Sequence, residues 1–252
     1  MIATPEVTLL AHTTIPNIDL VQVGEPNESG CVEMEFVYAT DSLMERGSSA
    51  RDMDTLAEVA GRSCYQAWSK PNPATRANVD YLANIIRQQH TSVLEHASAS
   101  FYITGVSRAF LAEITRHRHL SFSVQSQRFV DESEANIVVP PAIRDNDGAV
   151  MILEEVMDDV APAYQDLVTY LVGKGLPRKQ AREAARAVLP NMTEVRMVIT
   201  GNLRAWRDVL TRRLAPAADA EMREVADLIC TELEAIAPHS MQGVRETAAA
   251  DN

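Results

Sequence analysis

The chain has 252 residues, of which 46% are hydrophobic and 23% charged, a composition typical of a globular protein with a full core. Its formal net charge of −12 argues against general binding of nucleic acid or of an anionic membrane surface, since both require a basic protein surface. No stretch is long and apolar enough to predict a membrane span, and the N-terminal residues lack the pattern of a secretion signal.

The cysteine content indicates the redox environment. Cys31, Cys64 and Cys230 are widely separated, odd in number and form no CxxC pair. This spacing predicts reduced thiols rather than a disulfide framework or a zinc site. We therefore expect a cytoplasmic protein.

In the first half of the chain, hydrophobic periodicity and turn residues predict short strands and helices in mixed order. The predicted elements are strands at 18–23 and 31–40, helices at 51–67 and 75–89 separated by the breaker 69–73, and a strand at 98–104 that ends at Gly105.

In the second half, Ser107 and Asn202 are each predicted to cap the helix that follows. The predicted elements are a helix leading into Arg116, a long helix at 149–173, a helix from Pro177 to Val188, a strand at 192–200, and helices at 203–214 and 218–236.

These elements show no regular βαβ alternation, internal repeat or linker. We therefore predict one α+β domain over residues 1–252, in which helices flank a central sheet. The C-terminal tail, 238–252, is expected to be partly disordered, as chain ends often are.

A basic segment from Arg116 to Arg128 contrasts with this acidic chain. It contains three arginines, two histidines, three serines and two glutamines, and no carboxylate occurs between Glu113 and Asp131. Guanidinium groups bind phosphate bidentately, so the segment favours a site for phosphate-bearing ligands. The simpler interpretation is a solvated basic helix end.

Two further places contain unusual polar residues. Between a predicted helix and strand, His90, Glu95 and His96 could join His117 and His119 around a zinc ion. No HExxH-type spacing is present, however, and turn histidines are usually caps. On the helix after Asn202, Arg213 continues an apolar stripe, where it must extend to solvent, pair with a carboxylate or bind an anion.

Several catalytic motifs are absent from the sequence. It contains no GxGxxG fingerprint, no P-loop and no GxSxG elbow, and no cysteine lies in a setting that activates a nucleophile. An enzyme built on this chain would draw its reactivity from a cofactor.

The basic segment resembles the signature of the flavin-dependent thymidylate synthases, in which Arg-His-Arg is followed after seven residues by Ser. Here Arg116-His117-Arg118 precedes Ser126 at that spacing. The resemblance extends over about 30–240 and is similar to the actinobacterial branch. The segments that carry it are CYQAWSKPNP, HTSVLEHASASFYITGVSR, RHRHLSFSVQSQRFV, RAVLPN and GNLRAWRDVLTRR.

The resemblance implies an activity as well as a fold. Members methylate deoxyuridine monophosphate (dUMP) to thymidine monophosphate (dTMP), with methylenetetrahydrofolate as carbon donor and FAD, reduced by NADPH, as hydride source. They are homotetramers whose active sites are shared between subunits. No metal is implied.

Residue by residue, the resemblance implies three roles. Arg213 matches the arginine that polarises the uracil ring. The flavin-binding positions are His90, Ser92, Arg116, His117, Arg118, Val124, Asn202, Leu203, Arg204 and Asp208. The nucleotide-binding positions are Glu113, Arg116, Val124, Gln125, Ser126, Gln127, Arg128, Arg186 and Arg213.

The chain departs from the family pattern at a few positions. Val124 replaces a polar residue that contacts both ligands, Phe129 replaces a frequent tyrosine, and a histidine four residues after Arg213 is missing. These departures motivate one alternative, a flavin- or nucleotide-binding protein without catalysis. A second alternative is a metal-dependent phosphohydrolase that uses His90, His96 and His117.

Overall fold

The computed structural model describes residues 1–15, 22–23, 34–35, 51–65, 73–75 and 77–250. Most of the two predicted strands at 18–23 and 31–40 lies outside the described residues, as do Cys31 and all of the breaker except Pro73. Within them, β3 (Gln22–Val23) and β4 (Met34–Glu35) pair antiparallel.

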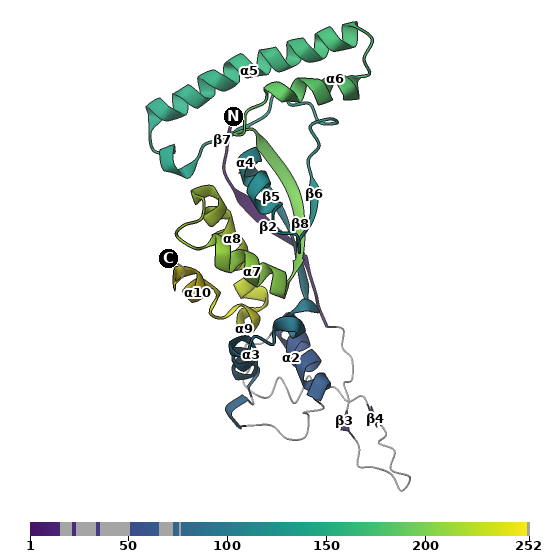
Figure 1. Cartoon of the computed structure of the whole chain (residues 1–252), viewed down its shortest axis with the longest axis vertical. Coiled ribbons are helices and arrows are strands. Elements are labelled where there is room, and N and C mark those ends of the chain that lie inside the picture. The colour runs from purple at the N-terminus through teal and green to yellow at the C-terminus, as the bar shows by residue number, and fades with distance from the viewer. Residues whose placement is uncertain (16–21, 24–33, 36–50, 66–72, 76, 251–252) are drawn as a thin grey trace.

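A four-stranded antiparallel sheet forms the centre of the molecule (Figure 1). Its strands, in the order β2-β5-β8-β6, are β2 (Glu6–His12), β5 (Ser98–Ser107), β8 (Glu194–Asn202) and β6 (Ser121–Val124). The register places Leu9, Phe101, Ile199 and Phe122 in one row across the sheet, and this row faces the core. The sequence predicted only β5 and β8 of these four strands.

β5 continues past Gly105, where the sequence predicted its end. Gly105 has a φ of +67°, and the register with β8 shifts between Ile103 and Val106, so the glycine forms a bulge within the strand. A Cβ atom at Gly105 would lie 1.8 Å from the Thr4 carbonyl oxygen, so this close approach requires glycine. Nearby, β1 (Ile2–Ala3) pairs parallel with β7 (Ile137–Val138).

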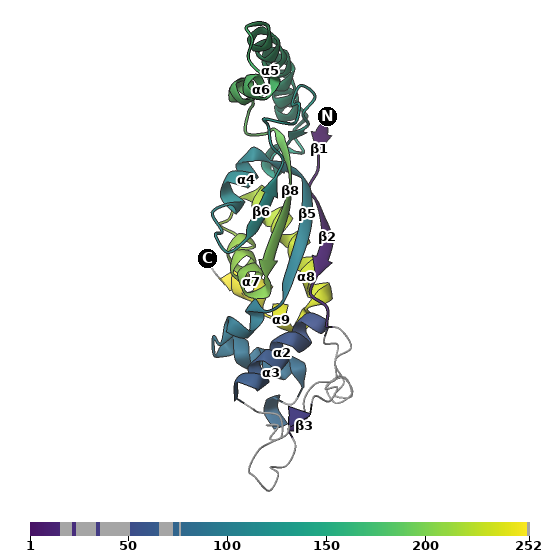
Figure 2. The same cartoon turned by 90° about the vertical axis from the view of Figure 1, so that its right-hand side faces the viewer.

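Helices cover one face of the sheet, as Figures 1 and 2 show. α7 (Leu203–Arg213) and α8 (Ala220–Ile236) pack there, and the fully buried Trp206 contacts Phe101 edge to face at 5.3 Å. α4 (Arg108–Ile114) follows β5, and the Ser107 hydroxyl accepts from the Phe110 N–H, as the predicted cap requires.

Two helical pairs extend the molecule at opposite ends of the sheet (Figure 1). At one end lie α2 (Asp52–Tyr65) and α3 (Asn78–Arg87), followed by a 3₁₀ turn at Thr91–Glu95. At the other end, α5 (Asp147–Gly173) and α6 (Arg178–Ala185) form a hairpin. α3 begins later than predicted because Pro73–Thr75 forms its own 3₁₀ turn.

Residues 238–250 belong to the tail that the sequence analysis expected to be partly disordered. They form α9 (Pro238–Met241) and α10 (Val244–Ala250), joined through Gly243 with a φ of +75°. Val244 and Ala248 are buried, and α10 packs against α7. The apolar residues of this segment were too few to predict a helix, and they are buried against α7 and, for α9, against α2, α3 and α8. Among the described residues, no helix has the length and hydropathy needed to cross a bilayer.

Candidate active site

Several predicted flavin-binding residues lie at the junction of β8 and α7 and on the first turns of α7. Asn202 ends the strand and caps the helix, since its Oδ1 accepts from the Ala205 N–H at 2.8 Å. The Leu203 N–H donates to the Ala97 carbonyl at 2.9 Å, which joins α7 to the residues before β5. Arg204 and Asp208 are four residues apart and therefore lie on the same face of α7.

A cavity of about 610 Å³ lies between this face of α7 and the turn that contains the Arg-His-Arg motif. Its size is typical of a pocket for a small molecule or cofactor. The cavity is lined by Glu95, Arg116, His117, Arg118, His119, Leu120, Asn202, Arg204, Ala205, Asp208, Val209 and Arg212.

The cavity combines cationic donors with apolar surface. Four arginines line it, while Leu120 and Val209 contribute buried aliphatic groups. Two carboxylates pair with some of the arginines: Glu95 forms an ion pair with Arg204, and Asp208 with Arg212 at 2.7 Å. Guanidinium donors suit phosphate groups and the aliphatic surface suits a ring system, so this donor set fits a flavin nucleotide.

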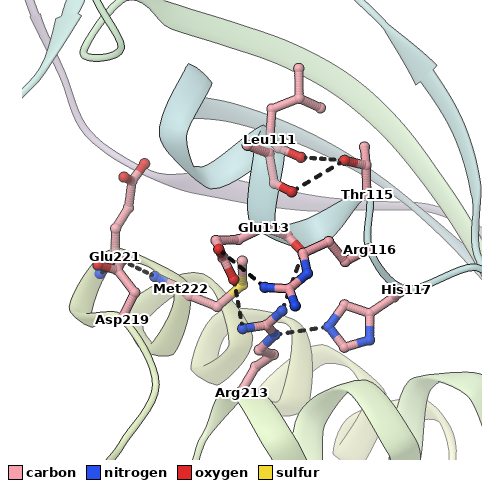
Figure 3. A network of polar contacts seen from close by, with 10 residues as sticks. Leu111, Glu113, Thr115, Arg116, His117, Arg213, Asp219, Glu221 and Met222 are labelled. Atoms are coloured by element: carbon pink, nitrogen blue, oxygen red, sulfur yellow. Dashed lines mark hydrogen bonds and ion pairs between the residues drawn. The ribbon is translucent and has the colours of Figure 1, made fainter.

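Next to the cavity, Arg213 is held in place by α4 and by the motif (Figure 3). Its Nη1 donates to Glu113 Oε2 at 3.1 Å, its Nη2 to the Glu113 carbonyl at 3.2 Å, and its Nε to His117 Nε2 at 2.8 Å. The side chain is only 16% exposed. A guanidinium has five N–H donors, so two remain for a ligand.

The contact with Arg213 determines the state of His117. An arginine can only donate, so His117 Nε2 accepts and the ring proton lies on Nδ1. Burial and the neighbouring Arg213 charge lower the pKa of His117 below its ordinary value. A neutral imidazole is therefore favoured here, and it orients Arg213 without repelling it.

The predicted phosphate-binding residues lie elsewhere in the chain. Gln125–Arg128 follow β6, and Arg186 lies in the 3₁₀ turn after α6, at the end of the molecule where Figures 1 and 2 show the α5–α6 hairpin. Neither group lines the cavity. Arg128 is 44% exposed and pairs weakly with Glu183 at 3.3 Å.

The structure adds Arg108, which the sequence analysis missed, to this second group. Its Nη2 donates to the Gln125 carbonyl at 3.4 Å and lies 3.8 Å from Glu132. The Gln125 side chain donates to Glu132 at 3.3 Å. Arg108 and Glu132 therefore both hold Gln125, at the start of the loop that carries Ser126 and Arg128. Arg108 follows a capping serine in sequence and looks like an ordinary helix start. Only its position beside the loop reveals this role.

The remaining predicted residues have different positions. His90 and Ser92 are exposed in the 3₁₀ turn that provides Glu95, but they do not line the cavity. Leu203 has a fully buried side chain in the core. Val124 ends β6, partly buried against the core. Ser126 accepts from the Arg128 N–H at 3.4 Å, and Gln127 is half-buried beside it.

The metal-dependent alternative finds no ligand set in the described part of the chain. No three His, Cys, Asp or Glu side chains converge there as a metal site would require. His117 instead binds Arg213.

Comparison with solved structures confirms the predicted fold class. The chain is similar to the UMP/dUMP methylase PolB from Streptomyces cacaoi bound with 5-Br UMP, with a TM-score of 0.67, 19% identity, and coverage of 98% of this chain and 96% of that chain. It is also similar to thymidylate synthase X from Helicobacter pylori with FAD and dUMP, with a TM-score of 0.54, 22% identity, and coverage of 78% and 94%.

Sequence comparison identifies closer relatives. A probable flavin-dependent thymidylate synthase of Mycobacterium phage L5 is 54% identical over 198 residues, which cover 77% of this chain and 81% of the relative. The flavin-dependent thymidylate synthase of Mycobacterium tuberculosis is 49% identical over 235 residues, covering 89% and 94%. The family model described as thymidylate synthase complementing protein matches residues 48–239. The chain therefore belongs to the family of flavin-dependent thymidylate synthases.

Proposed function

We propose that this protein methylates dUMP to dTMP, with methylenetetrahydrofolate as carbon donor and FAD, reduced by NADPH, as hydride source. The observation that carries the proposal is the cavity in which the Arg-His-Arg motif faces Arg204 and Asp208, next to the partly buried Arg213. The family relationship supports the same reaction. The three widely spaced cysteines remain the reason to expect a cytoplasmic location.

In this proposal the cavity binds FAD. Arg116, Arg118 and Arg204 would bind its phosphates and polar ring edge, and Asn202 and Asp208 would supply further hydrogen bonds. The exposed His90 and Ser92 would contact the flavin from the neighbouring 3₁₀ turn. The bound flavin supplies the hydride, so the chain itself needs no redox group.

Arg213 is the proposed catalytic residue. Its two unused N–H donors would bind the uracil and stabilise the negative charge that develops on the ring. Glu113 and His117 fix the guanidinium before the substrate arrives, which lowers the cost of reorganisation.

A covalent protein nucleophile is not part of this mechanism. Ser126 has no adjacent general base within the described residues, and its hydroxyl accepts from the Arg128 N–H. Burial raises the pKa of the Cys230 thiol to about 12, so the reactive thiolate is scarce.

We further propose a homotetramer in which the dUMP phosphate is bound by Ser126, Gln127, Arg128 and Arg186 of one subunit while Arg213 comes from another. None of these four phosphate-binding residues lines the cavity in one chain, which supports sharing between subunits. The apolar residues exposed on α5, including Met151, Ile152 and Tyr170, support an assembly that covers them.

The test is the visible absorption spectrum of the purified protein, followed by tritium release from 5-tritiated dUMP with methylenetetrahydrofolate and NADPH. A flavin spectrum that changes on addition of dUMP, together with tritium release, is expected. Flavin and dUMP binding without tritium release would favour the non-catalytic binding protein, and a colourless protein that gains no flavin would contradict the proposal.

A further inference from the structure

The C-terminal segment Pro238–Ala250 contacts α7, which lines the cavity, and also the α2–α3 pair. Figures 1 and 2 show α9 between α7 and the α2–α3 pair, and α9 contacts α2, α3 and α7. The family model ends at residue 239, so Ser240 and α10 lie beyond the part of the chain that it matches. The mechanism proposed above does not use this segment.

Ser240 connects the segment to α2 through a buried carboxylate. Its backbone N–H and its hydroxyl both donate to Asp54 Oδ1, at 2.7 and 2.6 Å, and the His239 N–H donates to Asp54 Oδ2 at 3.2 Å. Asp54 and Ser240 are both fully buried. Breaking this contact would leave an unsatisfied buried carboxylate, so the fold holds Ser240 firmly at this position.

Asn78, the first residue of α3, extends the connection. Its Nδ2 donates to the Asp54 carbonyl at 3.2 Å and to Glu58 at 2.7 Å, and its Oδ1 lies 2.7 Å from His239 Nδ1. The start of α3 is therefore attached to both α2 and α9.

Arg207 connects the same serine to α7. Its Nη1 donates to the carbonyls of Ser240 at 2.6 Å and Gln242 at 3.0 Å. Within the described residues it has no carboxylate at ion-pair distance, and burial lowers its pKa to about 10. The two carbonyls hold the partly buried Arg207 guanidinium. The position of α7, which carries Arg207, therefore depends on the position of residues 240–242.

Both connected parts lead to residues that line the cavity. Arg204 and Asp208, which line it, lie close to Arg207 in the sequence of α7. From α3 the chain leads within a few residues to the 3₁₀ turn Thr91–Glu95, whose Glu95 lines the cavity and pairs with Arg204. Ser240 thus joins, through Asp54 and Arg207, the supports of α7 and of the turn that carries Glu95.

We infer that Arg207 and Ser240 are positioning residues, which act through α7 and α3 to hold Arg204 and Glu95, two residues that line the cavity, at the separation that flavin binding requires. This inference rests on the proposed flavin site. It assigns to the C-terminal segment a role in cofactor affinity as well as in stability.

The test compares four variants, Arg207→Gln, Arg207→Lys, Ser240→Ala and Arg144→Gln, with the wild-type protein under conditions where all are folded. Arg207→Gln removes the charge, and Ser240→Ala removes the hydroxyl bond while keeping the backbone bond. Arg144→Gln is the matched control, because Arg144 forms a two-bond ion pair with Glu224, at 2.9 Å each, and does not line the cavity.

FAD affinity is measured by flavin fluorescence, and hydrogen–deuterium exchange is measured without FAD. Arg207→Gln should raise the FAD dissociation constant about tenfold, since part of the energy of a charge-assisted hydrogen bond is lost. Ser240→Ala should raise it less, and Arg207→Lys should restore it. Exchange should accelerate at residues 91–97 and 203–209 in Arg207→Gln and not in Arg144→Gln.

Wild-type FAD affinity in both Arg207→Gln and Ser240→Ala would overturn the inference, as would equal acceleration of exchange in Arg144→Gln. If Arg207→Gln does not fold, Ser240→Ala carries the test. A wild-type protein that binds no FAD would instead overturn the proposed function, whereas normal binding by the variants overturns the positioning role alone.

Discussion

Arg213, beside the cavity, differs from Arg128 and Arg186, near the α5–α6 hairpin, in how completely its own chain surrounds it. Arg213 is 16% exposed and makes three hydrogen bonds to Glu113 and His117, beside a cavity with walls on several sides. Arg128 is far more exposed, and Arg186 has no carboxylate at ion-pair distance among the described residues. Arg213 is therefore held in place by its own chain, whereas Arg128 and Arg186 are open to a ligand or to a second subunit.

This difference indicates separate tasks. A group that stabilises charge in a transition state works best when it is fixed in advance, and Arg213 is fixed. A group that captures a phosphate works from an exposed position, where a flexible guanidinium can close on the anion. The predictions below test this division, starting from the largest effect.

Replacing Arg213 with Ala should lower turnover by about 10²–10³, by analogy with the loss of one donor to a developing oxyanion. The measurement is kcat under saturating dUMP. The kcat of Arg213→Lys, which keeps the charge but not the planar guanidinium, should lie between those of the wild-type protein and Arg213→Ala. Near-normal turnover of Arg213→Ala would remove its catalytic role.

Replacing Arg186 or Arg128 with Ala should mainly raise the KM for dUMP. A lost charge-assisted hydrogen bond costs about 1.5–3 kcal/mol, which corresponds to roughly 10- to 100-fold in affinity. Arg178→Ala is the control, because Arg178 is exposed on the neighbouring helix and has no proposed role. If kcat fell as much as affinity, the division between the two groups would be wrong.

Replacing Ser126 with Ala should leave measurable activity at saturating dUMP. The lost hydrogen bond to the charged phosphate, about 1.5–3 kcal/mol, should weaken dUMP binding rather than stop the reaction. Tritium release at saturating dUMP is the assay. Complete loss of release with FAD and dUMP still bound would make Ser126 the nucleophile.

The smallest effect concerns pH and stability. Because the pKa of His117 is lowered in the folded protein, the unfolded state binds more protons as pH falls below about 6.5. The contribution of His117 is therefore complete above that pH and is lost as pH falls toward its folded pKa. Between pH 7.5 and 5, the free energy of unfolding measured with urea should fall more steeply in the wild-type protein than in His117→Gln. Parallel plots of this free energy against pH would contradict the assignment to His117.

Sequence patterns predicted part of the fold well. The long helix at 149–173 differs from α5 by only two residues at its start, and Asn202 and Ser107 cap helices as expected. β2 and β6 were missed because short exposed strands carry little periodic signal, and pairing with β5 and β8 stabilises them.

The sequence alone determined the residue types of the candidate site and, through the Arg-His-Arg spacing, the family. Local chemistry is sufficient for this, since guanidinium groups in an acidic chain already favour phosphate-bearing ligands. Only the tertiary structure decided that Arg213 binds His117 and Glu113, that Arg108 supports the Gln125 loop, and that the tail is ordered. These contacts join residues about 17 to 186 positions apart, and no local pattern encodes such pairs because they depend on how the sheet and helices pack.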